Sequence, residues 1–202
     1  DKRGIVINEP SIVAVNNKTG KLLAVGTEAK KMLGRTPAHI SVIRPLSGGV
    51  ISDFEMSQEI LRNFLRRLSG QRVLTSYRKA VVGVPSNLTE VERKSVEDAV
   101  MGAGVFQPYI IDEPLAAALG ARLPVDEPTA NMIVDIGGGT TEIAVISMAG
   151  TVTAKSLKVA GDRLNEDIVR FVRDEFKLAI GEATAEEIKL AVGLAIPLEA
   201  KL

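Results

Sequence analysis

The segment from Asp135 to Thr141 reads Asp-Ile-Gly-Gly-Gly-Thr-Thr and is the part of the sequence best suited to phosphate chemistry. Consecutive glycines let a backbone approach an anion closely, and their amide groups can point at phosphate oxygens. The carboxylate of Asp135 lies at the end of a predicted strand and could hold Mg²⁺ or its bound water. A tight hairpin turn is the alternative, but it needs only about two residues in special conformations, so we favour a phosphate loop. The predicted phosphate-binding residues are Gly137, Gly138, Gly139 and Thr140.

Two further patterns could serve the same chemistry, although their spacing alone does not decide it. Asp112-Glu113-Pro114 joins a predicted strand to a predicted helix, where a carboxylate could orient the attacking water in phosphoryl transfer. An acid at a helix start is also favoured by the helix dipole, and on spacing alone that explanation is the stronger one. Thr184-x-x-Glu187 has the spacing of a capping box and by itself indicates only a well-capped helix.

The composition excludes several classes of protein. The 202 residues include 25 basic and 25 acidic side chains, so the net charge of zero argues against a nucleic-acid binder. The sequence contains no cysteine, which excludes thiolate metal sites and disulfides and fits a cytoplasmic protein. His39 is the only histidine, so a Ser-His-Asp triad is not expected. No apolar run reaches the ~20 residues of a membrane span.

The hydrophobic pattern predicts strands that alternate with helices, which is typical of an α/β fold. The predicted strands are two within 4–15 that Pro10 separates, 22–25, two within 40–51, 79–84, 109–111, 132–136, 142–147 and 151–159. The last two are predicted to form a hairpin that turns at Ala149-Gly150. The predicted helices are 56–68, a helix from the capping box Thr89-x-x-Glu92 to Gly102, 115–119, 163–176, and 184–195.

Taken together, the motifs resemble those of the MreB-like bacterial actins, which belong to the actin/Hsp70 superfamily. The resemblance runs along essentially the whole chain, and four of its motifs are far more specific together than any one alone. They are Glu113-Pro-Leu-Ala-Ala-Ala, the strand and loop that start at Asp135, Ala160-Gly-Asp, and Thr184-Ala-Glu-Glu-Ile-Lys. A fifth matching segment, Gly83-Val-Pro-Ser, ends the predicted strand at 79–84.

The resemblance implies an actin-like (ribonuclease H-like) ATPase fold of two lobes that binds ATP and Mg²⁺. It assigns the positioning of the hydrolytic water to Glu113 with Thr140, and the Mg²⁺ shell to Asp135. It assigns the nucleoside to Glu186, Glu187 and Lys189. It also implies filaments at the cytoplasmic membrane surface that organise cell-wall synthesis and rod shape together with cell-wall elongation proteins.

By family position, residues 1–14 and 57–127 are expected to form the first large lobe and 15–56 its small lobe. Residues 128–163 are then part of the second large lobe, and 164–202 part of its small lobe. Relative to the family pattern, we expect the chain to lack a first phosphate loop and a later glycine pair beside adenine. Alone, it should therefore be weak or inactive as an ATPase and bind Mg-ATP at least ~100-fold more weakly than the complete protein.

The resemblance places a membrane contact near Val73 and Leu74, with Arg72, Tyr77 and Arg78 close by. A loop that packs on its own domain explains these residues equally well. For the whole protein, an Hsp70-like or sugar-kinase-like ATPase is the alternative, although the sequence offers no candidate for a kinase's catalytic aspartate. A non-hydrolysing scaffold is a third possibility: the missing loop argues for it, and the intact Glu113 and Thr140 argue against it.

Overall fold

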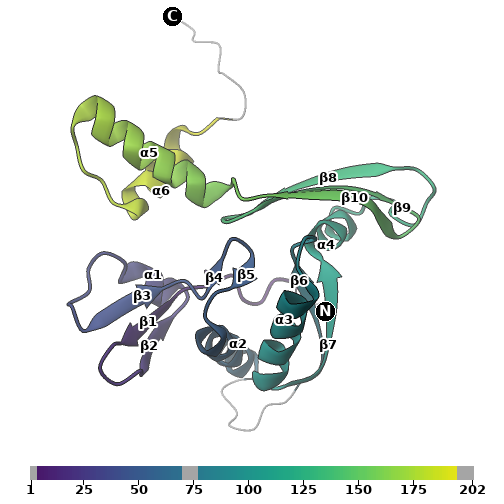
Figure 1. The fold of residues 1–202 in the computed structure, drawn as a ribbon, viewed down its shortest axis with the longest axis horizontal. Coiled ribbons are helices and arrows are strands. Elements are labelled where there is room, and N and C mark those ends of the chain that lie inside the picture. Colours follow the sequence, from purple (N-terminus) through teal and green to yellow (C-terminus); the bar gives the residue numbers. More distant parts are fainter. Residues whose placement is uncertain (1–3, 70–76, 195–202) are drawn as a thin grey trace, which may run out of the picture. The chain divides into compact units, whose positions relative to one another are not determined.

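A computed structural model describes residues 4–69 and 77–194, in which strands alternate with helices (Figure 1). The strands are β1 (Val13–Asn16), β2 (Leu22–Val25), β3 (Ile40–Ile43), β4 (Leu46–Ser47), β5 (Val50–Ile51), β6 (Tyr77–Val84), β7 (Val105–Asp112), β8 (Asn131–Ile136), β9 (Thr141–Ser147) and β10 (Gly150–Leu157). The helices are α1 (Thr27–Lys31), α2 (Phe54–Leu68), α3 (Glu90–Gly102), α4 (Glu113–Gly120), α5 (Gly161–Phe176) and α6 (Glu182–Val192).

The chain divides into two compact units, each of which is described by itself. The first unit comprises the described residues up to Asp135 together with Glu142–Ser156. The second unit comprises Ile136–Thr141 and the described residues from Leu157 onward.

A small antiparallel sheet of order β2-β1-β3 forms one part of the first unit. Successive side chains of β1 point to opposite faces of this sheet. Ala14 therefore packs with Ala29 of α1 on one face, whereas Val13 packs with Ile60 of α2 on the other. The sheet is thus covered by a helix on each face: α1 packs on the face of Ala14, and α2 packs on the face of Val13.

Strands β6 and β7 run parallel and are connected through α3, which packs against β7. Their register pairs Val84 with Asp112, so both strands end at the same edge. The next residues along the chain, Pro85 and Ser86 after β6 and Glu113 after β7, leave the sheet at that edge. The carboxyl ends of parallel strands are where α/β proteins commonly bind ligands.

A second antiparallel sheet has the order β10-β9-β8. Helix α4 packs on it through a core that includes Ala118, Ala144 and Ile146. The β9–β10 hairpin turns at Met148 and Ala149, with φ of 52° and 59°, so the predicted position at Ala149-Gly150 was wrong by one residue. Positive φ at both turn residues matches a two-residue hairpin loop. The carbonyls of residues 127 and 125 accept the N–H groups of Met148 and Ala149 at 3.0 and 2.7 Å and help to hold this conformation.

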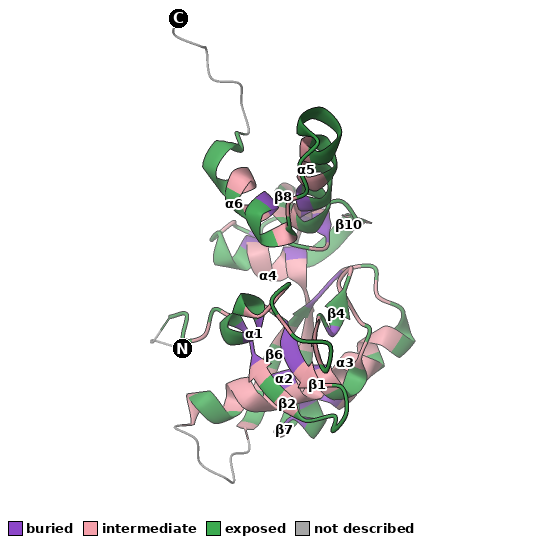
Figure 2. Cartoon of the chain, turned by 90° about the vertical axis from the view of Figure 1, so that its left-hand side faces the viewer, coloured by how far each residue is buried: buried purple, intermediate pink, exposed green. Residues whose placement is uncertain are grey.

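The second unit contains the glycine-rich segment, α5 and α6. Helix α5 packs on α6 but is exposed along much of its length (Figure 2). Its one buried residue is Asn165, which is 3% exposed. The side-chain Oδ1 of Asn165 has no hydrogen-bond partner.

Two other predicted elements differ from those observed. Residues 4–8 form no strand, because no strand of the described residues pairs with this segment. The side chain of Ile5 in this segment is 86% exposed. The second capping box is also wrong, since α6 begins at Glu182 after Gly181 and Thr184 lies inside the helix. The first capping box is confirmed: Thr89 and Glu92 exchange both of its hydrogen bonds.

Thr89 caps a helix and Thr184 does not, so substitutions at the two positions should differ in their effect on stability. Thr89→Ala should lower the free energy of unfolding by about 0.5–2 kcal/mol, because it removes a side-chain cap. Thr184→Ala should change it by less than about 0.5 kcal/mol, because Thr184 is an exposed residue within a helix. Urea-induced unfolding followed by circular dichroism measures both, and an equal loss for the two variants would contradict the observed start of α6.

Candidate functional site

Glu113 is the first residue of α4 and directly follows β7. Pro114 comes next, at a helix position that favours proline because no intrahelical N–H bond is needed there. Gly83 of β6 lies beside Glu113: a Cβ added at Gly83 would be 3.3 Å from the Glu113 Cγ. The absence of a side chain at Gly83 therefore gives Glu113 its place against the end of β6.

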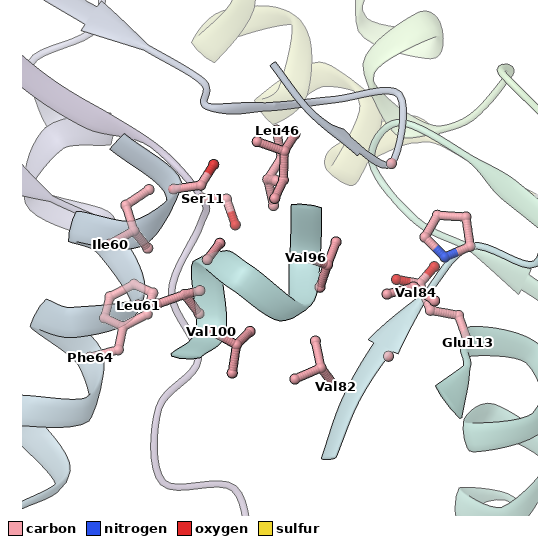
Figure 3. Close-up of a pocket in the computed structure, with 16 residues that line it drawn as sticks. Ser11, Leu46, Ile60, Leu61, Phe64, Val82, Val84, Val96, Val100 and Glu113 are labelled. Carbon is pink, nitrogen blue, oxygen red and sulfur yellow. The ribbon is translucent and has the colours of Figure 1, made fainter. Parts of the chain in front are cut away.

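A cavity of about 220 Å³ lies beside Glu113 within the first unit (Figure 3). Apolar side chains of α2 and α3 line it, among them Ile60, Phe64, Val96 and Val100. Glu113 is the only charged side chain among the described residues that line this cavity. The carboxylate thus meets apolar surroundings on one side.

Burial is the largest cause that raises the pKa of Glu113 above its ordinary value of 4.5. The negative charges of Asp135 and then Glu142 raise this pKa further. Because the fold favours the protonated form of this carboxyl, the ionised form of Glu113 takes up a proton more readily than an exposed glutamate does. A raised proton affinity suits a group that orients water and accepts a proton from it.

Glu142 is a buried carboxylate that the sequence reasoning missed. It is 1% exposed, and its Oε2 accepts the Ser86 hydroxyl at 2.7 Å and the Ser86 backbone N–H at 3.4 Å. Its Oε1 is buried and has no hydrogen-bond partner. A signal existed in the sequence, because the alternation along β9 places Glu142 on the same face as the buried Ala144 and Ile146.

Asp135 is half-buried near the end of β8 and is the predicted contact to the Mg²⁺ shell. The described residues contain no cluster of three or more acidic, histidine or cysteine side chains arranged to hold a metal ion. Mg²⁺ commonly takes one or two carboxylates and completes its shell with water and substrate phosphates. The negative charge of Asp135 also raises the pKa of Glu113, and it would attract a hydrated Mg²⁺.

The glycine loop lies in the second unit, where the Gly137 N–H donates to the Thr140 carbonyl at 2.9 Å. None of the three glycines has a positive φ, so a left-handed turn does not explain them. The carbonyls of Gly137 and Gly138 accept the N–H groups of Gly161 and Asp162 at 3.1 and 2.8 Å. The loop therefore satisfies the first N–H groups of α5, which has no side-chain cap.

Lys189 of α6 lies beside this loop. Its Nζ donates to the Gly161 carbonyl at 3.1 Å. A Cβ added at Gly161 would be 3.4 Å from that Nζ and 3.3 Å from the Gly137 carbonyl oxygen. The second unit thus brings together the predicted phosphate loop and one predicted nucleoside residue.

The remaining predicted site residues also lie in the described parts of the chain. Glu186 is partly buried and Glu187 exposed on α6, and Thr140 is 9% exposed. Asp162 was not predicted as a site residue, yet its carboxylate is 3.6 Å from where a Cβ at Gly138 would stand. Thr140 and Glu113 belong to different units, so their joint action stays a prediction.

The predicted membrane contact falls mostly outside the described residues, because Arg72, Val73 and Leu74 lie there. Tyr77 begins β6, and its hydroxyl donates to the Leu65 carbonyl at 3.0 Å. No helix in the described ranges is both long enough and apolar enough to cross a bilayer.

Comparison with known proteins places these features in a family. A family model described as MreB/Mbl protein matches residues 1–202. The cell shape-determining protein Mbl of Bacillus subtilis is 47% identical over 185 residues, which are 92% of this chain and 55% of Mbl. The cell shape-determining protein MreB of Escherichia coli K12 is 46% identical over 199 residues, which are 96% of this chain and 57% of MreB. The chain therefore spans somewhat more than half the length of these relatives.

Solved structures match the fold closely. MreB5 of Spiroplasma citri bound to ADP is 37% identical with a TM-score of 0.90, over 98% of this chain and 59% of that protein. The same protein bound to AMPPNP also gives a TM-score of 0.90, over 97% of this chain. The MamK double helical filament, at 23% identity and a TM-score of 0.74, supports the fold alone. The predicted α/β actin-like fold is confirmed.

Proposed function

Because the chain belongs to the MreB/Mbl family, we propose that its protein is an ATP-binding and ATP-hydrolysing bacterial actin homologue. It assembles into filaments beneath the membrane that, with cell-wall elongation proteins, organise cell-wall synthesis and cell shape. Relatives named as cell shape-determining proteins support this role. Nucleotide binding is supported by the Spiroplasma relative, whose structures were determined with ADP and AMPPNP.

The glycine loop is the observation that carries the nucleotide proposal. Its carbonyls accept hydrogen bonds from the start of α5, and none of its glycines has a positive φ. Close approach of a phosphate to the backbone would explain glycines at these positions. Gly137, Gly138 and Gly139 bind phosphate oxygens, with Thr140 at the end of the loop. Lys189, beside the loop on α6, adds a positive charge and, with Glu186 and Glu187, faces the nucleoside.

For hydrolysis, we assign the orientation of the attacking water to Glu113 and give Thr140 a hydrogen bond to that water. The raised pKa of Glu113 supports a role in accepting the proton as the water attacks. Asp135 holds the hydrated Mg²⁺. The bound ion supplies charge neutralisation at the phosphates.

The lobe assignment is part of the same proposal. Residues 1–14 and 57–127 form a first large lobe and 15–56 its small lobe. The β2-β1-β3 sheet supports a compact small lobe that is joined to α2 through a shared core. Residues 128–163 belong to the second large lobe and 164–202 to its small lobe, and the pairing of α5 with α6 supports the latter.

Sedimentation of the full-length protein tests the filament proposal. Protein with Mg-ATP should move to the pellet above a critical concentration, because head-to-tail contacts form open polymers. The same protein with EDTA and no nucleotide should stay in the supernatant. Pelleting that is identical with and without nucleotide, or none at any concentration, would contradict nucleotide-dependent assembly.

A further inference from the structure

Packing alone does not explain why Glu142 is buried. A carboxylate taken out of water costs several kcal/mol unless it is paired and hydrogen-bonded. Among the described residues, no basic side chain forms an ion pair with Glu142. Its hydrogen bonds come from Ser86 alone, at one of its two oxygens. Neutral residues of similar size would fill this place at lower cost.

The Ser86–Glu142 bond links two sheets that are otherwise separate. Ser86 follows β6 of the parallel β6–β7 sheet, whereas Glu142 belongs to β9 of the antiparallel β10-β9-β8 sheet. Helix α4 contacts both sheets: it packs on β6 and β7, and its Ala118 packs with Ala144 of β9. The bond thus ties together the two surfaces that support the helix on which Glu113 stands.

The same strand end also contacts Glu113 directly. Only two residues lie between Ser86 and Gly83, whose missing side chain leaves room for the Glu113 Cγ. A shift of the β6 end would therefore move the backbone against which Glu113 packs. Groups that orient a reacting water tolerate little displacement, since a 1 Å error can cost about 100-fold in rate.

We propose that Ser86 and Glu142 are a positioning pair for the hydrolytic reaction: their hydrogen bond fixes the end of β6 and thereby holds Glu113 in place for water activation. This inference rests on the proposed ATPase function. It also gives the Gly83-Val-Pro-Ser86 motif a role. Gly83 leaves room for the Glu113 side chain, and Ser86 holds the end of β6 through its hydrogen bond to Glu142.

The test compares Ser86→Ala, Glu142→Ala and Glu142→Gln in the full-length protein. Single-turnover hydrolysis should slow about 10- to 100-fold in both alanine variants, while the dissociation constant for Mg-ATP should stay within about threefold, a change below ~0.7 kcal/mol. Glu142→Gln keeps an oxygen that can accept the Ser86 hydroxyl and should recover most of the lost rate. Loss of rate without loss of affinity distinguishes positioning from general damage to the fold.

Thr89→Ala is the matched control. It removes a hydroxyl that also donates to a glutamate at 2.7 Å, but on the exposed start of α3. It should lower stability and leave hydrolysis unchanged. Wild-type hydrolysis in Ser86→Ala, a glutamine variant as slow as Glu142→Ala, or parallel losses of affinity and rate would each overturn the positioning role. Glu113→Ala and the wild-type protein are measured alongside: normal hydrolysis in Glu113→Ala would overturn the proposed role of Glu113, and absence of hydrolysis in the wild-type protein would overturn the proposed ATPase function itself.

Discussion

Replacing Glu113 by alanine should slow ATP hydrolysis by the full-length protein about 100-fold or more, within the range for a lost acid–base group. The reason is that Glu113, at the carboxyl edge of the β6–β7 sheet, is assigned to the attacking water and not to the nucleotide. Affinity for Mg-ATP should hold or increase slightly, because a negative charge is removed near the phosphates. Single-turnover hydrolysis, with the protein in excess over ATP, measures the chemical step without interference from filament turnover.

Glu90→Ala is the control for this variant. Glu90 is likewise the first residue of a helix, α3, but it is exposed and is not one of the predicted site residues. If Glu113 were only a favourable helix-start acid, both substitutions would cost about 0.3–1 kcal/mol of stability and leave hydrolysis intact. A wild-type rate in folded Glu113→Ala protein would contradict the assignment of the attacking water to Glu113.

Gly138→Ala should weaken the binding of Mg-ATP by roughly 10- to 100-fold, because one charge-assisted bond to phosphate contributes about 1.5–3 kcal/mol. The fold itself should tolerate the methyl group. The added Cβ would meet only the Asp162 carboxylate, at 3.6 Å or more, which is ordinary van der Waals contact. A loss of affinity would therefore come from the contact between the loop and the bound phosphate, and not from damage to the fold. Calorimetric titration measures the affinity, and thermal unfolding without nucleotide measures the stability.

Gly181→Ala controls for adding a methyl group in the same unit. Gly181 precedes α6, and a Cβ there meets nothing within 4 Å. Its affinity for Mg-ATP should equal that of the wild type. Equal affinities in Gly138→Ala and the wild type would mean that phosphate does not approach this part of the backbone.

Local patterns predicted the fold well where local interactions decide it. The stripe of apolar residues and the Thr89-x-x-Glu92 spacing predicted α2 and α3, because helix formation depends on neighbours within one or two turns. Thr184-x-x-Glu187 has the same spacing, yet α6 begins two residues earlier than Thr184. Spacing alone shows that a cap is possible and does not show where the tertiary contacts start the helix.

The candidate site was predictable to the extent that its residues follow one another in the chain. The glycine loop, Glu113 and Asp135 stand in short motifs at strand ends, and the β6–β7 register explains why a strand end is a suitable place. Ser86 and Glu142 are 56 residues apart, so only the packing of two sheets brings them together. The bond from Lys189 to Gly161 across 28 residues is likewise a tertiary contact.

Calorimetric titration of the full-length protein with ATP in the presence of Mg²⁺ tests the central claim most directly. The account predicts saturable binding of one ATP per chain that weakens in Gly138→Ala and survives in Glu113→Ala, because the first residue is assigned to the phosphates and the second to the water. Absence of saturable binding at millimolar ATP, or an affinity for ATP that is unchanged in Gly138→Ala, would contradict it.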